Sequence, residues 1–291
     1  MAILIDFSQI CLVNLYSKLN DTSAFYTDAT SDRDKAKSIF RQLILSSLIQ
    51  YNKMFRISYG DMVISCDGLS YWRRDVFPQY KSTRKKQREQ AGIDWKFVFS
   101  CIDELIEDLR NNFPYKVVRV DSAESDDVIA TLTKKFVSEK EDVLIVSSDK
   151  DFVQLHSPLV DQYSPQQRKF VIEMNPQKYL KEKIIKGDRG DGIPNILTDD
   201  NVFEEGRKQN MISSKRLNEF LSHDLTKYYD SDVKNRYMRN RMLIDFNYIP
   251  DVIRQSILDE YDKPVQGSIG KVFDYLIKHR YGLLVEDIKN F

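Results

Sequence analysis

The chain has 291 residues, enough for a large hydrophobic core, and its 44 basic and 44 acidic side chains leave no net charge. Three scattered cysteines, Cys11, Cys66 and Cys101, argue against both a disulfide framework and a zinc site with closely paired cysteines. There is no signal-peptide pattern and no apolar run of roughly 18 residues, which predicts a soluble, cytoplasmic protein without membrane association.

Strands are predicted at four short apolar runs rich in β-branched residues. These runs are Ala2 to Phe7, Met62 to Cys66, Tyr115 to Val120, and Val143 to Ser147. The segments between them have helical periodicity, which predicts an α/β fold with a mainly parallel central sheet and helices on both faces. After about residue 180 the strand pattern fades. We therefore expect one domain at residues 1–180 and a helical region at residues 181–291.

Acidic residues follow each predicted strand at the point where the strand ends. They are Asp6, Asp67, the acids of Glu124-Ser125-Asp126-Asp127, and Asp149 with Asp151. The carboxyl ends of parallel strands lie at one edge of the sheet, and ligands bind there in such folds. Farther along the chain, Asp188 and Asp191 are three residues apart and would share one face if this segment is helical. We expect all these acids to lie close together.

Each of these acids alone has a simpler explanation, because an Asp after a strand commonly caps a helix or forms a turn. Asp126 and Asp127 could serve only to favour a helix N-terminus. That explanation weakens when every strand end requires it. Carboxylates crowded into a small volume repel one another, and a bound cation removes the repulsion. Oxygen ligands without His or Cys favour two Mg²⁺ ions, with Mn²⁺ as a substitute, and two such ions support phosphodiester hydrolysis.

A basic and aromatic segment begins a few residues after Asp67 and predicts binding of nucleic acid. Its candidate binding residues are Arg73, Tyr80, Lys81, Arg84, Lys85, Lys86 and Arg88. Cations neutralise phosphates, and aromatic rings stack on unpaired bases. The alternative is a solvated helix with buried aromatic side chains, but the proximity to Asp67 favours the functional interpretation. Lys81 and Arg84, one helical turn apart, are the candidates for holding the scissile phosphate.

These residues, in this order, resemble the 5′-nuclease (flap endonuclease) superfamily, and most closely its ribonuclease H branch from T-even-like bacteriophages. The resemblance rests on A-E-x-D-D at residues 123–127, S-x-D-x-D at 147–151, G-D-x-x-D-x-I-P at 187–194, and W-R…Y-K-x-x-R at 72–84. The segment Asn240 to Pro250 is similar to the phage branch specifically. One departure is the replacement of a Gly-rich phosphate-binding turn by Asn195 to Asn201, so the hairpin there should be longer or irregular. Lys208, Lys215 and Arg216 would then contact phosphates.

The resemblance implies a PIN-like 5′-nuclease core, a helical arch at about residues 73–95 for the 5′ single strand, and a duplex-binding helical hairpin after Pro194. Metal binding would fall to two groups of acids. Asp6, Asp67, Glu124 and Asp126 would surround a first Mg²⁺, with Asp127 of the same motif as a further candidate, and Asp149, Asp151, Asp188 and Asp191 would serve a second. The candidate catalytic residues are Lys81, Arg84, Asp126, Asp149 and Asp151.

The activity implied is that of a Mg²⁺-dependent 5′-to-3′ exonuclease and flap endonuclease. It would act on RNA–DNA hybrids and DNA duplexes with a 5′ end or flap, and remove RNA primers from lagging-strand fragments in an infected bacterial host. A monomer that contacts a phage single-strand DNA-binding protein and a sliding clamp is implied as well. Two alternatives are a non-catalytic junction-binding protein and a PIN-like ribonuclease. The complete set of acids argues against the first, and the basic arch with the helical C-terminal region argues against the second.

Overall fold

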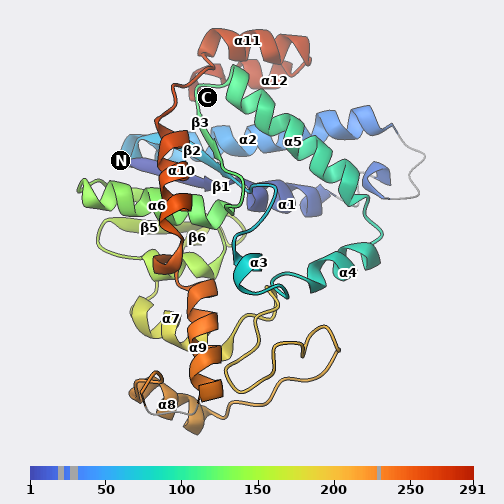
Figure 1. Cartoon of the computed structure of the whole chain (residues 1–291). Coiled ribbons are helices and arrows are strands. Elements are labelled where there is room, and N and C mark those ends of the chain that lie inside the picture. The colour runs from blue at the N-terminus through green and yellow to red at the C-terminus, as the bar shows by residue number, and fades with distance from the viewer. Residues whose placement is uncertain (19–22, 27–31, 228–230) are drawn as a thin grey trace.

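The computed structural model describes residues 1–18, 23–26, 32–227 and 231–291. Its centre is a six-stranded sheet with the strand order β3-β2-β1-β4-β5-β6 (Figure 1). The strands are β1 (Ala2–Asp6), β2 (Asp61–Cys66), β3 (Lys116–Arg119), β4 (Val143–Val146), β5 (Val160–Ser164) and β6 (Lys169–Phe170). The first five are parallel, and β6 pairs antiparallel with β5. The predicted mainly parallel sheet is confirmed.

The four predicted strands all form, with their ends shifted by one residue at most. β5 and β6 were not predicted, because β5 contains Asp161 and Gln162 instead of a continuous apolar run. β1 is buried on both faces, as an inner strand of a parallel sheet must be. Its side chains alternate between two hydrophobic clusters, with Ile3 and Ile5 in one and Leu4 in the other.

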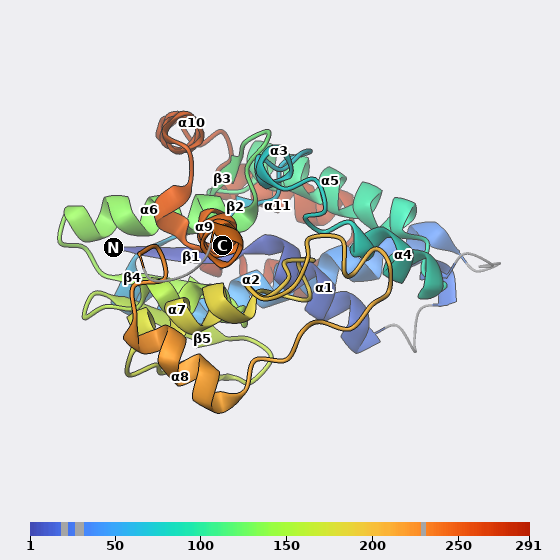
Figure 2. The same ribbon diagram turned by 60° about the horizontal axis from the view of Figure 1, so that its bottom comes forward.

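Helices cover both faces of this sheet. The N-terminal two thirds of the chain contain α1 (Phe7–Lys18), η2 (Ser23–Phe25), α2 (Arg33–Tyr59), α3 (Arg73–Val76), α4 (Thr83–Gln90), α5 (Trp95–Asn112), α6 (Ser125–Ser138), η3 (Lys150–Leu155) and α7 (Pro176–Lys186). α1, α2 and α5 pack on one face, and α6 packs on the other. α4 lies beside the first turns of α5, in the segment predicted to form an arch (Figures 1 and 2).

Helices dominate the C-terminal part of the chain. They are α8 (Ser214–Ser222), α9 (Ser231–Ile244), η4 (Phe246–Tyr248), α10 (Asp251–Asp262), α11 (Ile269–Lys278), α12 (Gly282–Val285) and η5 (Ile288–Asn290). α7, α8 and α9 share a third hydrophobic cluster below the sheet (Figure 1). α10 packs beside α6, and α11 joins the cluster of α1, α2 and α5. The boundary expected after residue 180 falls inside α7, so this helix belongs to neither expected part alone.

The connection between α7 and α8 differs from the expected hairpin. Residues 187–213 form turns and no helix, so a helical hairpin does not begin directly after Pro194. Asparagine side chains brace this connection instead of helical hydrogen bonds. The Asn195 amide donates to the carbonyl of Asn210 at 2.8 Å, and its carbonyl oxygen accepts from the backbone N–H of Leu197 at 3.0 Å. The longer, irregular connection agrees with the absence of the Gly-rich turn.

No helix in the described ranges is long and apolar enough to cross a membrane.

Candidate active site

A pocket of about 670 Å³ opens at the carboxyl edge of the sheet, and acids from distant segments line it. Eight of the nine predicted metal ligands are among its lining residues: Asp6, Asp67, Glu124, Asp126, Asp149, Asp151, Asp188 and Asp191. Lys81, Arg84 and Arg88 of the basic segment line the same pocket. The geometry therefore brings together, in one pocket, the acids and the cations that the sequence placed at this edge.

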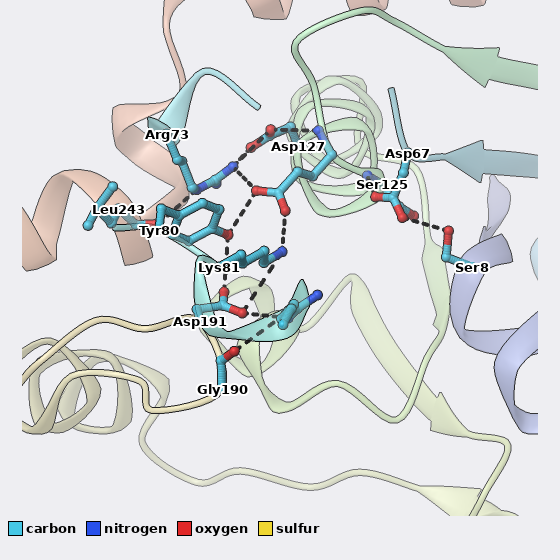
Figure 3. A network of polar contacts seen from close by, with 12 residues as sticks. Ser8, Asp67, Arg73, Tyr80, Lys81, Ser125, Asp127, Gly190, Asp191 and Leu243 are labelled. Atoms are coloured by element: carbon cyan, nitrogen blue, oxygen red, sulfur yellow. Dashed lines mark hydrogen bonds and ion pairs between the residues drawn. The ribbon is translucent and has the colours of Figure 1, made fainter. Parts of the chain in front are cut away.

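Hydroxyl and backbone groups hold the first two acids in place. Asp6 is the last residue of β1, and its Oδ2 accepts a hydrogen bond from the hydroxyl of Ser147 at 2.8 Å. Asp67 follows β2, and its two carboxylate oxygens accept from the hydroxyl of Ser8 at 2.6 Å and from the backbone N–H of Ser125 at 2.9 Å (Figure 3). These contacts fix the orientation of both carboxylates before any ligand binds.

Burial and mutual repulsion disfavour the charged form of several of these acids. Burial, followed by repulsion from Asp67, raises the pKa of Asp6 to about 7. Burial, together with repulsion from Asp149 and Asp6, raises the pKa of Asp126 well above its ordinary value. The pKa of Asp149 is also raised by burial, although Lys183 opposes the shift. A set of carboxylates that repel one another in a buried position is a favourable environment for a bound cation.

Glu124 lies at the start of α6 in a network of buried polar contacts. Its Oε2 accepts from Arg73 Nη1 at 2.8 Å and from the Tyr80 hydroxyl at 2.9 Å, and its Oε1 pairs with the ammonium group of Lys81 (Figure 3). Burial alone would raise the pKa of Glu124, but Lys81 and Arg73 outweigh that effect and lower it. Glu124 is therefore a stable anion within the pocket.

Arg84 and Lys183 form ion pairs with three further acids of the pocket. Arg84 Nη2 lies 2.6 Å from Asp191 Oδ1. Lys183 of α7 pairs with Asp151 and lies 2.9 Å from Asp188 Oδ2. Within the described residues, no group of three or more His, Cys, Asp or Glu side chains has the spacing of a formed metal site. The ammonium groups keep these acids in ion pairs, while the chemistry of the donor set, carboxylate oxygens alone, fits a hard divalent cation.

Asp188 and Asp191 belong to a turn, and the helical spacing considered for them is wrong. Asp188 and Ile193 exchange two backbone hydrogen bonds, at 2.8 and 2.7 Å, so the chain reverses between them. Asp188 Oδ1 accepts from the backbone N–H of Gly190 at 2.8 Å, which stabilises this turn. Gly187 has a φ of +69°, and a Cβ there would lie 2.3 Å from the carbonyl oxygen of Ile193. Glycine is required at that position for the turn to close.

Asp127 was predicted as a metal ligand, but the structure places it outside the pocket. Its side chain is inaccessible to solvent and does not line the pocket. It accepts from the Trp72 indole at 3.0 Å and from the backbone N–H of Glu124 at 3.0 Å, and it forms a two-pronged ion pair with Arg73 (Figure 3). Asp126 and Asp127 are about 100° apart around the helix, so only one of them can face the pocket.

Two predicted nucleic-acid-binding residues are also corrected. Arg73 and Tyr80 are each only 3% exposed, and both point into the protein interior. Arg73 contacts Glu124 and Asp127, and the hydroxyl of Tyr80 donates to Glu124 and to Asp191 at 3.0 Å. Buried in these contacts, neither side chain is available to a phosphate or a base. They organise the acidic network instead.

The remaining arch residues lie partly as expected. Lys81 precedes α4 and has a φ of +56°, so Lys81 and Arg84 do not lie one turn apart on a helix. They reach the same pocket because the backbone N–H of Lys81 donates to the carbonyl of Asp191 at 2.8 Å, which ties the base of the arch to the turn. The side chains of Lys85 and Lys86 lie outside the described part of the structure.

Several residues that hold the site had no sequence signal. Gln162 is buried in β5, and its amide donates to the carbonyls of Ser147 and Asp149 at 2.9 and 2.6 Å. Its carbonyl oxygen contacts His156 Nε2 at 2.9 Å. A single glutamine in an unpredicted strand carries no recognisable pattern. Lys183 was missed because its partners lie far away in sequence or across a turn.

Comparison with known proteins finds related nucleases along the whole chain. The family model of the 5′–3′ exonuclease N-terminal, resolvase-like domain matches residues 3–185, and that of the T4 RNase H C-terminal domain matches residues 175–291. The ribonuclease H of Enterobacteria phage T4 is 34% identical over 303 residues, covering 99% of this chain and 95% of that protein. The flap endonuclease Xni of Shewanella oneidensis is 30% identical over 135 residues, covering 43% of this chain and 48% of that protein.

Solved structures share the fold at lower sequence identity. The T5 D15 protein co-crystallized with metal ions has a TM-score of 0.60 and 16% identity, covering 90% of this chain and 99% of that one. The T5 D15 flap endonuclease in a complex with DNA and metal ions has a TM-score of 0.59, 14% identity and the same coverage. The fold, the gathered acids and the two family matches together show that this chain is a nuclease of the 5′–3′ exonuclease family, with a C-terminal part of the T4 RNase H type.

Proposed function

We propose that this protein is a Mg²⁺-dependent 5′-to-3′ exonuclease and flap endonuclease that acts on RNA–DNA and DNA duplexes. The observation that carries the proposal is the pocket in which eight carboxylates face Lys81, Arg84 and Arg88. The acids suit a divalent cation, and the adjacent cations suit a phosphate backbone. Such a pocket suits the hydrolysis of a phosphodiester.

The resemblance of the acidic motifs to the 5′-nuclease superfamily implies two groups of metal-binding residues. We assign Asp6, Asp67, Glu124 and Asp126 to a first Mg²⁺, and Asp149, Asp151, Asp188 and Asp191 to a second. Burial and repulsion raise the pKa of Asp6 and Asp126, which supports cation binding at these acids because a cation would relieve the repulsion. Two bound Mg²⁺ ions would supply an activated water and stabilise the leaving oxygen, and Mn²⁺ could replace them.

The protein's own cations would orient the substrate. Lys81 and Arg84 project from the base of the arch into the pocket, and each contacts an acid of the site. We assign to them the binding of the scissile phosphate and of the negative charge that develops on it. Ser8 and Ser147 hold Asp67 and Asp6 in fixed orientations, and Gln162 fixes the backbone that carries Asp149.

The relationship to the T4 ribonuclease H supports a proposal for the biological role. We propose that the protein removes RNA primers from lagging-strand fragments during phage replication in the bacterial cytoplasm. It would work as a monomer alongside a single-strand DNA-binding protein and a sliding clamp. The complete set of acids in the pocket favours this role over that of a non-catalytic junction-binding protein. The match to the T4 RNase H C-terminal domain favours it over a PIN-like ribonuclease.

The test uses the purified protein with a 5′-labelled RNA–DNA hybrid and a 5′-labelled DNA flap, each in Mg²⁺ and in EDTA. We expect short 5′ products that disappear in EDTA, and their relative rates show which substrate the enzyme prefers. Asp126→Asn is the matched control, because it removes one charge without a change of size. Tight binding of both substrates with cleavage of neither would favour the junction-binding alternative.

A further inference from the structure

The pocket has a second, apolar wall that the proposed chemistry does not use. It is formed by α5 and α1, and Phe99, Ile102 and Leu12 line it. Phe99 and Trp95 are one helical turn apart on α5, with their ring centroids 5.7 Å apart and their planes tilted by 32°. The guanidinium carbon of Arg88, on α4, lies 4.9 Å from the centroid of Phe99 and 5.6 Å from that of Trp95. These three side chains form an aromatic and cationic column under the arch.

Core packing accounts for Trp95, which packs against the hydrophobic cluster of α1, α2 and α5, but not for Phe99. The buried residues of α5 include Val98, Ile102 and Leu105, which face the sheet, whereas the Phe99 side chain is 37% exposed. The Trp95 indole N–H is shielded from solvent and has no hydrogen-bond partner within the described residues. Phe99, exposed at the pocket and held between Trp95 and Arg88, therefore offers ring surface to a flat ligand.

The column is continuous with the acidic site. Phe99 and Arg88 line the same pocket as Asp67 and Asp126, so a strand whose phosphate lies at the acids would pass the Phe99 ring and the Arg88 guanidinium. Aromatic faces stack on any nucleobase, and an arginine adds a favourable charge over the ring and toward the backbone. The adjacent cations select a polyanion as the occupant, which distinguishes this surface from an apolar patch for a protein partner.

We propose that Phe99, Trp95 and Arg88 form a stacking subsite for the unpaired bases of a 5′ single strand, adjacent to the cleaved phosphodiester. The proposal rests on the nuclease function stated above and adds a specificity element to it. The subsite recognises the presence of bases and not their sequence, because every base has a π-face. It would favour flaps over ends that carry no unpaired bases.

The experiment compares two DNA flap substrates that differ only in the flap. One has normal bases beside the junction, and the other has abasic residues at the same positions. We expect Phe99→Ala to lower kcat/KM on the normal flap by about five-fold to about 150-fold, the range for one lost base–aromatic stack. The abasic flap should be cut by wild type at a similarly reduced rate, and Phe99→Ala should lower that rate no further.

Matched controls separate this effect from damage to the fold. Phe273→Ala removes another exposed Phe, 46% accessible and on α11, and should leave the ratio between the two substrates unchanged. Arg88→Lys, which keeps the charge and loses the planar group, should give an intermediate ratio. An equal loss on both flaps for Phe99→Ala would overturn the proposal. So would a wild-type enzyme that cuts both flaps at the same rate.

A separate binding measurement keeps the subsite testable if the wild type cuts neither flap, a result that would refute the proposed function. A single-stranded oligonucleotide with 2-aminopurine in place of one base is titrated with protein in EDTA. Stacking on a ring quenches its fluorescence, so wild type should quench the signal and Phe99→Ala should not. Absence of quenching by the wild type, with the oligonucleotide bound, would overturn the subsite independently of catalysis.

Discussion

Arg73 and Asp127 form a two-pronged ion pair in the protein interior, with Nη1 2.9 Å from Oδ2 and Nη2 2.8 Å from Oδ1 (Figure 3). Arg73 also donates from Nε to the carbonyl of Leu243 near the end of α9, at 2.8 Å, and from Nη1 to Glu124. One side chain therefore joins α3, α6 and α9 directly behind the acidic pocket. The pair is buried and does not line the pocket, so it supports the site from within the protein.

Loss of Asp127 should destabilise the protein strongly. Asp127→Ala leaves the Arg73 charge buried with Glu124 as its one acidic partner among the described residues, which should cost about 3–5 kcal/mol in the free energy of unfolding. Denaturant titration followed by circular dichroism measures this cost. Asp127→Asn keeps the size of the side chain and should leave the Mg²⁺ concentration for half-maximal activity unchanged. A large increase in that concentration with normal stability would instead make Asp127 a metal ligand.

Asp126→Asn and Asp151→Asn, in contrast, should impair catalysis and not stability. Each removes a charged oxygen from the pocket, and we expect kcat to fall on the order of a hundred-fold or more while DNA affinity is largely retained. Single-turnover cleavage and a binding titration in Ca²⁺ separate the two quantities. In EDTA at pH 8, Asp126→Asn should also raise the denaturation midpoint, because it removes repulsion with Asp149 and Asp6. Cleavage by Asp151→Asn at the wild-type rate in Mg²⁺ would refute the metal assignment.

Without metal, stability should fall as the pH rises through neutrality. The pKa of Asp6 is about 7 in the folded protein against 3.8 as its ordinary value, so between these values the folded state binds more protons than the unfolded state. Stability therefore decreases with rising pH, by on the order of 1 kcal/mol between pH 6 and pH 8 for this group. The pKa values of Glu124 and Asp191 are lowered, so these two acids stabilise the folded protein equally at pH 6 and pH 8 and do not add to the pH dependence.

Urea denaturation in EDTA at pH 6 and pH 8 measures this dependence, and Mg²⁺ is then added at both values. We expect Mg²⁺ to stabilise the protein more at pH 8, because a cation neutralises the acids that are then ionised. Equal stability at the two pH values in EDTA would show that burial and repulsion do not raise the pKa of Asp6.

Gln162→Leu should impair catalysis without weakening DNA binding. The substitution removes the two hydrogen bonds to the carbonyls of Ser147 and Asp149, which should cost about 1–3 kcal/mol of stability and displace the Asp149 carboxylate. We expect a lower kcat, a higher Mg²⁺ requirement and an unchanged KM for DNA. The exposed Gln167 is the control, since Gln167→Leu should alter none of these. Identical kcat and Mg²⁺ requirement in Gln162→Leu would exclude a positioning role.

The sequence by itself determined the sheet and the place of the site. The four apolar runs are local patterns that bury both faces of a strand, and the acids after them are tied to the strand ends by the chain itself. Asp6 and Asp67 could therefore be assigned to one edge of the sheet without knowledge of the packing. The same logic failed for β5, whose polar residues Asp161 and Gln162 hide its pattern.

Only the tertiary structure decided which neighbouring side chains face the pocket. Asp126 and Asp127 are adjacent acids of one motif, but the helix rotates them apart, and packing turns Asp127 toward Arg73. The inward direction of Tyr80 and the ion pairs of Lys183 likewise depend on segments distant in sequence. A local pattern specifies the chemical type of a side chain. Its direction and its partners depend on long-range packing, which no local pattern contains.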